Sequence, residues 1–181
     1  MRHLVLLSGG IDSATAAHLL VSRGEAVDLI HFQYGQAAAA AELTASQSVA
    51  SSLNLIAEVV TLNGRKFGKG EIRGRNALLV DVATVMWPEP SGVIVLGIHG
   101  GTPYADCTPA FVQRLQAVLD LETDGALRLL APFVEWTKVE VWRQAQALGV
   151  PIELTHSCEA ASVPCGECSS CLDRDWLHAR A

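Results

Sequence analysis

The chain has 181 residues, a mass of 19.3 kDa and a formal net charge of −6, and half of its residues are hydrophobic. This length fits one domain with a small appendage. No apolar stretch approaches the ~18 to 20 residues that span a bilayer, and the first apolar run is too short for a secretory signal. We therefore expect a cytoplasmic protein with reduced thiols and no membrane contact. The acidic balance, with no basic run longer than Arg65-Lys66, disfavours stable nucleic-acid binding and favours a small-molecule substrate or a protein partner.

Apolar strand-like runs alternate with stretches of helical period from the N-terminus onward. In chain order the sequence predicts strand 3–7, helix 12–23, strand 26–32, helix 37–53, strand 55–62, loop 63–74, helix 75–87, strand 92–98, helix 109–121, strand 128–130 and helix 138–148. This alternation indicates an α/β fold, a Rossmann-like parallel sheet with helices on both faces. We expect an α/β domain at residues 1–150 and a small C-terminal zinc-binding segment at 151–181.

The predicted sheet also says where a ligand would bind. Residues 4–7 and 93–96 are apolar throughout, which is typical of strands buried on both faces of a parallel sheet. Ligands in such sheets bind beyond the carboxyl ends of the strands. The loops of interest are therefore 8–13, 33–36, 63–76 and 99–107.

The first of these loops, at residues 8–13, reads S-G-G-I-D-S. Its glycines permit a sharp turn with φ > 0, and the amides that open the next helix can bind an anion, so the loop predicts a phosphate site. The Lys of the G-x-x-x-x-G-K-[ST] motif is missing, which disfavours a kinase or GTPase. The alternative is a tight turn in which Asp12 or Ser13 caps the helix.

Four cysteines lie close together near the C-terminus with the spacing C-x6-C-x2-C-x2-C. They are Cys158, Cys165, Cys168 and Cys171. Among reduced cytosolic thiols this spacing favours a metal over a disulfide, and four thiolates form a closed tetrahedral zinc site with a structural role. A redox pair or buried free thiols are the alternatives.

The string S-G-G-x-D-S after the first strand resembles the pyrophosphate loop of the ATP-pyrophosphatase enzymes, whose fold is adenine nucleotide alpha hydrolase-like. Further motifs follow in order: Q-Y-G-Q at 33–36, G-R-N at 74–76, Y-A-D-C at 104–107, T-K at 137–138, and the cysteine cluster. Together they resemble the 7-cyano-7-deazaguanine synthase family of queuosine biosynthesis, almost from end to end of the chain. That resemblance implies an ATP-dependent ligase that converts 7-carboxy-7-deazaguanine to the nitrile with ATP and ammonia, and a homodimer with structural Zn²⁺.

The resemblance also implies roles for residues around the phosphate loop. Ser8, Gly9, Gly10, Asp12 and Ser13 are expected to bind the ATP phosphates, with Asp12 near Mg²⁺. A further catalytic residue is expected to act with Asp12 and Ser13: it is Lys138, whose fixed positive charge would stabilise the phosphoryl oxygens in the transition state. From the residues alone, Lys138 could equally be a surface side chain in the first turn of a helix.

Substrate binding is expected from Tyr34, Gln36, Arg75, Asn76 and Asp106. Arg75 could present its guanidinium to a carboxylate or phosphate. The alternative is a purely structural role, in which Asn76 caps the helix predicted at 75–87. Asp106 could accept hydrogen bonds from a guanine-like N1–H and exocyclic amine, although a loop carboxylate is more often solvated.

A lone cysteine outside the cluster, Cys107, is more often a small buried hydrophobe than a reactive group. It follows Asp106 in the loop that precedes the helix at 109–121. We expect it to pack in the core.

Several positions depart from the family pattern. Gln33 replaces the usual aspartate, alanines at 37–41 replace basic residues, the segment 97–107 is shorter, its acidic residue is lost near Thr102, and Thr108 replaces an arginine. Because the phosphate loop and the cysteine cluster are intact, activation of the substrate is expected to persist while the acceptor side is altered.

Three alternatives to the ammonia-using synthase stay open. The first is a paralogue, of the type found in antiphage operons, that transfers the activated deazaguanine carboxylate to an amine of a protein partner. The second is an RNA-modifying relative such as a tRNA thiolase or lysidine synthase, which should carry a basic face that this chain lacks. The third is a nucleotide-binding subunit whose catalysis has decayed.

Overall fold

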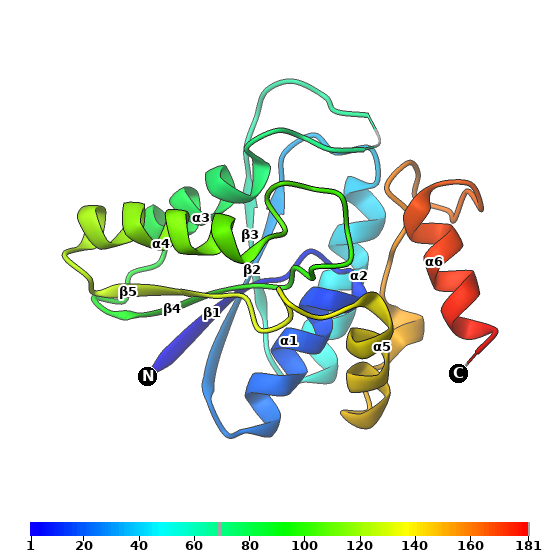
Figure 1. Ribbon diagram of the computed structural model, residues 1–181, viewed down its shortest axis with the longest axis horizontal. Helices are drawn as coiled ribbons and strands as arrows, with labels where there is room; N and C mark the ends of the chain where they lie inside the picture. The colour runs from blue at the N-terminus through cyan, green and yellow to red at the C-terminus, as the bar shows by residue number, and fades with distance from the viewer. Residues whose placement is uncertain (69, 181) are drawn as a thin grey trace.

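The architecture is a five-stranded parallel sheet with helices on both faces (Figure 1). A computed structural model describes residues 1–68 and 70–180. The strands are β1 (Arg2–Leu6), β2 (Ala26–Gln33), β3 (Ala57–Thr61), β4 (Gly92–Leu96) and β5 (Leu127–Leu130), in the order β3-β2-β1-β4-β5. This confirms the predicted fold class, and no predicted strand or helix boundary is off by more than two residues.

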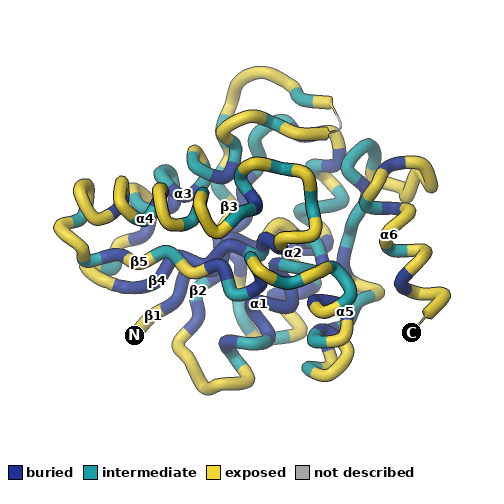
Figure 2. Tube along the Cα trace, viewed as in Figure 1, coloured by how far each residue is buried: buried dark blue, intermediate teal, exposed yellow. Residues whose placement is uncertain are grey.

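The helices form one layer on each face of the sheet. One face carries α1 (Ile11–Ser22), α2 (Ala39–Ser52) and α5 (Lys138–Ala147), and the other carries α3 (Arg75–Met86) and α4 (Pro109–Thr123). Alternate strand residues serve the two layers, so Val5 packs with α1 and α5, whereas Leu4 and Leu6 pack with α3 and α4. The central strands β1 and β4 are buried along almost their whole length (Figure 2), as their continuous apolar runs predicted.

The strand order creates a switch point between β1 and β4. Chain from β1 continues through α1 to β2 on one side, and chain from β4 continues through α4 to β5 on the other. The loops after β1 and β4 therefore lead to helices on opposite faces, and the point between them at the carboxyl edge is where open α/β sheets bind ligands.

Beyond α5 the chain adds a short 3-10 helix, η1 (Ile152–Leu154), and a helix that the sequence did not predict, α6 (Ser169–His178). Leu177 of α6 joins the core beneath α1 and α5, and His178 stacks edge-on against Trp142 with ring centroids 4.7 Å apart. In Figure 1, α6 and α4 lie at opposite ends of the longest axis. No helix within the described residues is long and apolar enough to cross a membrane.

Candidate active site

The loop between β1 and α1 has the backbone geometry of an anion site. Gly9 adopts φ +88°, and a Cβ atom there would lie 2.5 Å from the carbonyl oxygen of Glu42, so only glycine fits. The helix begins at Ile11 with Gly10 as its N-cap, and Gly10 brings no side-chain acceptor. The N–H groups of the first turn are therefore available to a phosphate.

Two serine hydroxyls brace this loop from inside. The hydroxyl of Ser13 donates to the carbonyl oxygen of Gly10 at 3.0 Å and accepts from the main-chain N–H of Ser8 at 3.2 Å. The Ser8 hydroxyl in turn accepts from the N–H of Gly10 at 3.2 Å. The alternative in which Asp12 or Ser13 caps the helix is wrong, because the helix already starts one residue before Asp12.

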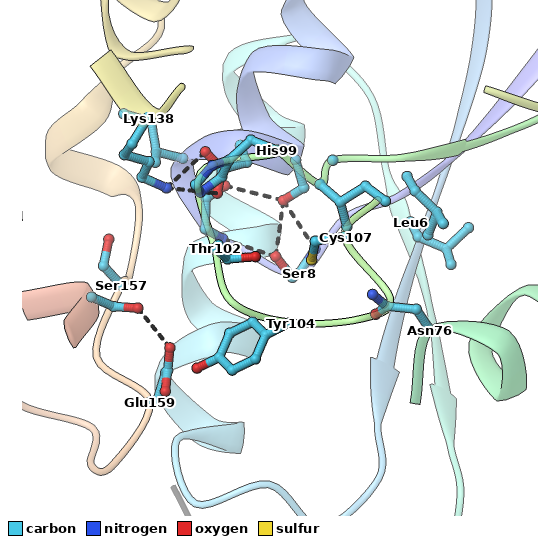
Figure 3. Close-up of a pocket in the computed structure, with 18 of the residues that line it drawn as sticks. Leu6, Ser8, Asn76, His99, Thr102, Tyr104, Cys107, Lys138, Ser157 and Glu159 are labelled. Carbon is cyan, nitrogen blue, oxygen red and sulfur yellow. Dashed lines mark hydrogen bonds and ion pairs between the residues drawn. The ribbon is translucent and has the colours of Figure 1, made fainter. Parts of the chain in front are cut away.

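Asp12 is paired with Lys138, which lies 126 positions away in the sequence. The Lys138 Nζ lies 2.6 and 2.7 Å from the two carboxylate oxygens of Asp12 (Figure 3). The two side chains are 21% and 25% exposed, so the pair is partly shielded from water. Lys138 is the first residue of α5, where Thr137 and Glu140 form a capping box. The position in a first turn is as predicted, but Lys138 is not a free surface side chain.

The loop after β4 approaches the phosphate loop as closely as two backbones can. A Cβ atom on Gly97 would lie 2.5 Å from both the N and the Cα atoms of Ser13. Gly100 is equally tight, with a Cβ position 2.5 Å from the carbonyl oxygen of Val134. Gly97 therefore lets the segment that follows β4 run beside the start of α1, and Gly100 lets it run beside the loop between β5 and α5.

That segment also places a buried histidine beside the ion pair. The Nδ1 atom of His99 accepts from the N–H of Gly101 at 3.1 Å, so the neutral ring carries its proton on Nε2. Nε2 lies 4.0 Å from a carboxylate oxygen of Asp12. Burial lowers the pKa of His99, which keeps the ring neutral beside Lys138.

The residues expected to bind substrate form a connected group. Arg75 donates from Nε to the side-chain oxygen of Asn76 at 3.2 Å, and Asn76 donates to the main-chain oxygen of Asp106 at 3.3 Å. Burial raises the pKa of Tyr34, which lies beside the Arg75 guanidinium. The alternative in which Asn76 caps α3 is wrong, because the N-cap is Gly74 and Asn76 lies inside the helix.

The side chain of Gln36 forms its hydrogen bonds with other residues of the protein. Its side-chain oxygen accepts from the N–H of Tyr34 at 2.8 Å, and its amide donates to the main chain of Phe32 at 3.1 Å and to Glu42 at 2.8 Å. Gln36 is therefore placed to orient Tyr34 and Glu42 rather than to contact a ligand directly.

Two adjoining cavities lie over this edge of the sheet. The larger, of ≈ 370 Å³, runs from the phosphate loop to Arg75 and Asn76 and is walled on its far side by the C-terminal segment. The smaller, of ≈ 90 Å³, includes Gln36 and Asp106. Both are lined by Tyr34, Glu42, Arg75, Tyr104 and Glu159. Asp106 therefore faces the smaller cavity, whereas the buried Cys107 lines the larger one and packs in the core as expected.

The C-terminal segment is tied down by one arginine. Arg174 of α6 donates to the main-chain oxygens of Thr155 and Ile152 at 3.0 and 2.7 Å, and to the hydroxyl of Ser157 at 3.1 Å. Burial lowers the pKa of this guanidinium. The bonds hold α6 against residues 152–157, which line the larger cavity at His156 and Ser157.

The four cysteines meet as the spacing predicted. The Sγ atoms of Cys158, Cys165, Cys168 and Cys171 all lie within 4.8 Å of one another. Four thiolates at about 2.3 Å from one zinc ion would stand about 3.8 Å apart, so the cluster fits a tetrahedral site after a small contraction. Main-chain N–H groups of Glu167 and Cys168 lower the pKa of Cys165 to about 6, which favours the thiolate that a metal requires.

Several charged or titratable cavity residues were not singled out from the sequence, among them Glu42, His99, Glu159 and Arg174. Glu42 lies in the first turn of α2 and Glu159 directly follows the first cysteine of the cluster. A carboxylate six residues after Gln36 and another beside Cys158 were the available signals. His99 and Arg174 had no motif of their own.

Two solved structures share the fold. One is a predicted subunit of tRNA methyltransferase from Methanocaldococcus jannaschii, with a TM-score of 0.52 and 16% identity over 81% of this chain and 74% of that one. The other is the U34-tRNA thiolase NcsA from Methanococcus maripaludis, with a TM-score of 0.51 and 13% identity over 99% and 64%. At these identities the likeness shows the fold alone, and it confirms the adenine nucleotide alpha hydrolase-like architecture.

Sequence comparison is more specific. The 7-cyano-7-deazaguanine synthase of Synechococcus sp. (strain CC9605) is 35% identical over 95% of this chain and 90% of that protein. The enzyme of the same name from Methanoculleus marisnigri is 34% identical over 92% and 88%. The model of the queuosine biosynthesis protein QueC matches residues 2–71 and 61–179. The chain therefore belongs to the QueC family, to whose 7-cyano-7-deazaguanine synthases it is similar over nearly its whole length.

Proposed function

We propose that this protein is an ATP-dependent ligase that adenylates the carboxylate of 7-carboxy-7-deazaguanine and condenses it with ammonia to give 7-cyano-7-deazaguanine. The observation that carries the proposal is the pair Asp12–Lys138 at the mouth of an intact phosphate loop, with Arg75 and Tyr34 across the same cavity. Family membership supplies the substrate class.

The chemistry follows from the inertness of a carboxylate, which ammonia cannot attack because oxide would have to leave. A substrate carboxylate oxygen attacks the α-phosphorus of ATP, pyrophosphate departs, and the acyl adenylate forms. Ammonia then displaces AMP and leaves a primary amide. A second ATP adenylates the amide oxygen, again releasing pyrophosphate, and loss of the nitrogen protons with AMP yields the nitrile.

For the first step, we assign the ATP phosphates to Ser8, Gly9, Gly10, Asp12 and Ser13. The exposed amides of the loop and the α1 N-terminus suit the β- and γ-phosphates. Lys138 suits the developing negative charge on the phosphoryl oxygens. Its bond to Asp12 keeps the ammonium at the start of α1, which is where that charge would form.

A magnesium ion would be held by Asp12, whose carboxylate faces the cavity and offers the oxygen ligands that Mg²⁺ prefers. When bound, the ion would neutralise phosphate charge. Zinc would be held by the four cysteine thiolates with no open position, and its part is structural.

For binding of the deazaguanine acid, we assign substrate contact to Tyr34, Arg75 and Asn76, which line the larger cavity. Gln36 and Asp106 support them from the smaller cavity, since Gln36 holds Tyr34 and Asp106 holds Asn76. The Arg75 guanidinium lies at the end of the larger cavity away from the phosphate loop and offers its donors to acceptor atoms of the substrate there.

One observation favours a second candidate. The residues after the Tyr-Gly-Gln motif are alanines at 37–41, and Gln33 and Thr108 also depart from the family pattern. A paralogue could pass the adenylated deazaguanine to an amine of a protein partner, because the activation machinery does not depend on these positions. Ammonia is the simpler acceptor and remains the main proposal.

The experiment is product analysis by mass spectrometry. Purified protein is incubated with ATP, Mg²⁺, 7-carboxy-7-deazaguanine and ammonium, and separately with a candidate partner protein in place of ammonium. The proposal expects the nitrile and two AMP per nitrile in the first mixture. A mass adduct on the partner, without any nitrile, would establish the paralogue instead, and absence of both products would favour a decayed subunit.

A further inference from the structure

Glu159 lies at the wall that the two cavities share. Its carboxylate has no assigned role in the phosphate loop or in the cysteine cluster. It lies directly after Cys158 and lines both the larger and the smaller cavity. One of its oxygens accepts from the hydroxyl of Ser170 at 2.7 Å. Among the described residues it forms no ion pair, so most of its acceptor capacity faces the cavity.

The other carboxylates of the larger cavity have different positions or partners. Asp12 is held by Lys138, and Asp173 is an exposed residue of α6. The Glu42 carboxylate accepts from the Gln36 amide, and the Glu42 main chain packs against Gly9 of the phosphate loop. Glu159 is the half-buried carboxylate that lies away from the phosphates.

The surroundings of Glu159 suit a flat heteroaromatic ring. Tyr104 and Tyr34 both lie close enough for the Glu159 charge to raise their pKa values, although burial is the larger cause for each. Figure 3 shows Tyr104 beside Glu159, with Lys138 at the opposite end of the drawn pocket. A ring placed between these ends would turn one edge to Lys138 and the other to Glu159, with tyrosine rings against its face.

A guanine-like ring carries two adjacent donors on one edge, N1–H and the exocyclic amine. One carboxylate can accept both at once, and a charged acceptor makes such bonds stronger than a neutral one. The opposite edge of the proposed substrate bears the carboxylate that must reach ATP. The two ends of the cavity therefore match the two ends of the molecule.

We infer that Glu159 determines specificity by accepting hydrogen bonds from the N1–H and the exocyclic amine of the deazaguanine ring. The cysteine loop, residues 158–171, then supplies a substrate-contact residue as well as a wall of the cavity. This inference rests on the proposed function. It moves to Glu159 the recognition role expected for Asp106, which faces the smaller cavity. Zinc binding then matters for the substrate because the residue next to Cys158 must be held in place.

The test is calorimetric binding of two probes in the presence of a non-hydrolysable ATP analogue. The probes are 7-carboxy-7-deazaguanine and the same acid without its 2-amino group. The wild type should bind the full acid about tenfold more tightly or better, because one charge-assisted hydrogen bond is lost with the amine. Glu159→Gln should weaken binding of the full acid about 10- to 100-fold and abolish the preference for it.

Two matched variants separate recognition from structure. Glu167→Gln changes a carboxylate in the same cysteine loop that lines neither cavity, and Glu42→Gln changes the other shared carboxylate. Both should keep the preference for the full acid, and the zinc content of all three variants should equal that of the wild type. If Glu159→Gln lost zinc, the shorter Glu159→Asp should lower the preference with the metal retained.

An unchanged preference in Glu159→Gln overturns the inference while leaving the proposed function intact. A wild type that binds both acids equally does the same. A wild type that binds the ATP analogue but neither acid instead overturns the proposed function, and the assignment of Glu159 falls with it.

Discussion

The main-chain N–H of His156 donates a 2.9 Å hydrogen bond to the carbonyl oxygen of Gly9, which joins the C-terminal segment to the phosphate loop. The Nε2 atom of the same histidine lies 3.0 Å from the main-chain oxygens of both Cys158 and Ala161, so Nε2 carries the proton and is shared between them. One residue thus spans from the cysteine loop to the loop proposed to bind ATP. Order in the first should therefore support the second.

Removing one thiolate tests this connection. Cys168→Ser should abolish stoichiometric zinc binding and lower the free energy of unfolding, because a three-thiolate site binds zinc more weakly and the fold of residues 152–178 depends on the site. MgATP affinity should fall as well, through His156 and Gly9. Metal analysis, thermal unfolding and ATP titration measure the three effects. Cys107→Ser, outside the cluster, should keep its zinc; zinc loss with full thermal stability and unchanged activity in Cys168→Ser would count against the connection.

Lys138 should matter for chemistry more than for stability. Lys138→Met removes the cation beside the phosphate loop and should lower pyrophosphate release about 100- to 1,000-fold, the usual effect of deleting one preorganised donor to transition-state charge. The thermal midpoint should change little, since the ion pair is partly exposed. Arg143→Met removes an exposed cation of the same helix and serves as the control. Equal activity in the two variants would refute the assignment.

The contact between the loops after β1 and β4 can be tested at Gly97. In Gly97→Ala the new methyl would lie 2.5 Å from main-chain atoms of Ser13, which cannot rotate away. Overpacking of this kind costs about 1–3 kcal/mol and should displace the phosphate loop. Gly64→Ala adds a methyl with no heavy atom within 4 Å and should be neutral. Urea unfolding and ATP titration of both variants provide the comparison; an unaffected Gly97→Ala would contradict the packing.

Stability should fall as the pH drops below about 6.5, the unperturbed pKa of histidine. Burial lowers the pKa values of His18, His31 and His99, so the unfolded chain binds more protons than the folded one and the free energy of unfolding rises with pH. Each histidine adds at most about 1.4 kcal/mol per pH unit to the slope. Urea unfolding between pH 5 and 7.5 measures it, and His31→Asn should reduce it. A protein that became more stable on acidification would disprove this.

Much of this architecture could be predicted from the sequence because it rests on local and repetitive signals. Continuous apolar runs identified β1 and β4, and the glycine loop between β1 and α1 identified the anion site. The family resemblance implied that Asp12 and Lys138 both act at the ATP phosphates, but their ion pair required the structure, since no periodicity links residues 126 positions apart.

The remainder depended on tertiary packing. Helix α6 was missed because its first turn contains Cys171 of the metal motif, a stretch that reads as a loop, and because the packing of Leu177 and His178 is visible only in the folded chain. Gln36 was expected to touch substrate, but its three hydrogen bonds bind the protein itself. Glu159 and His99 became candidates only when chain folding placed them beside the cavity.

Release of pyrophosphate that depends on 7-carboxy-7-deazaguanine tests the proposed function most directly. Purified wild-type protein is given ATP and Mg²⁺ with or without 7-carboxy-7-deazaguanine, and pyrophosphate is followed continuously. Our account predicts release only when the acid is present, and near-complete loss of that release in Lys138→Met. No release under any condition, or release that does not depend on the acid, would contradict it.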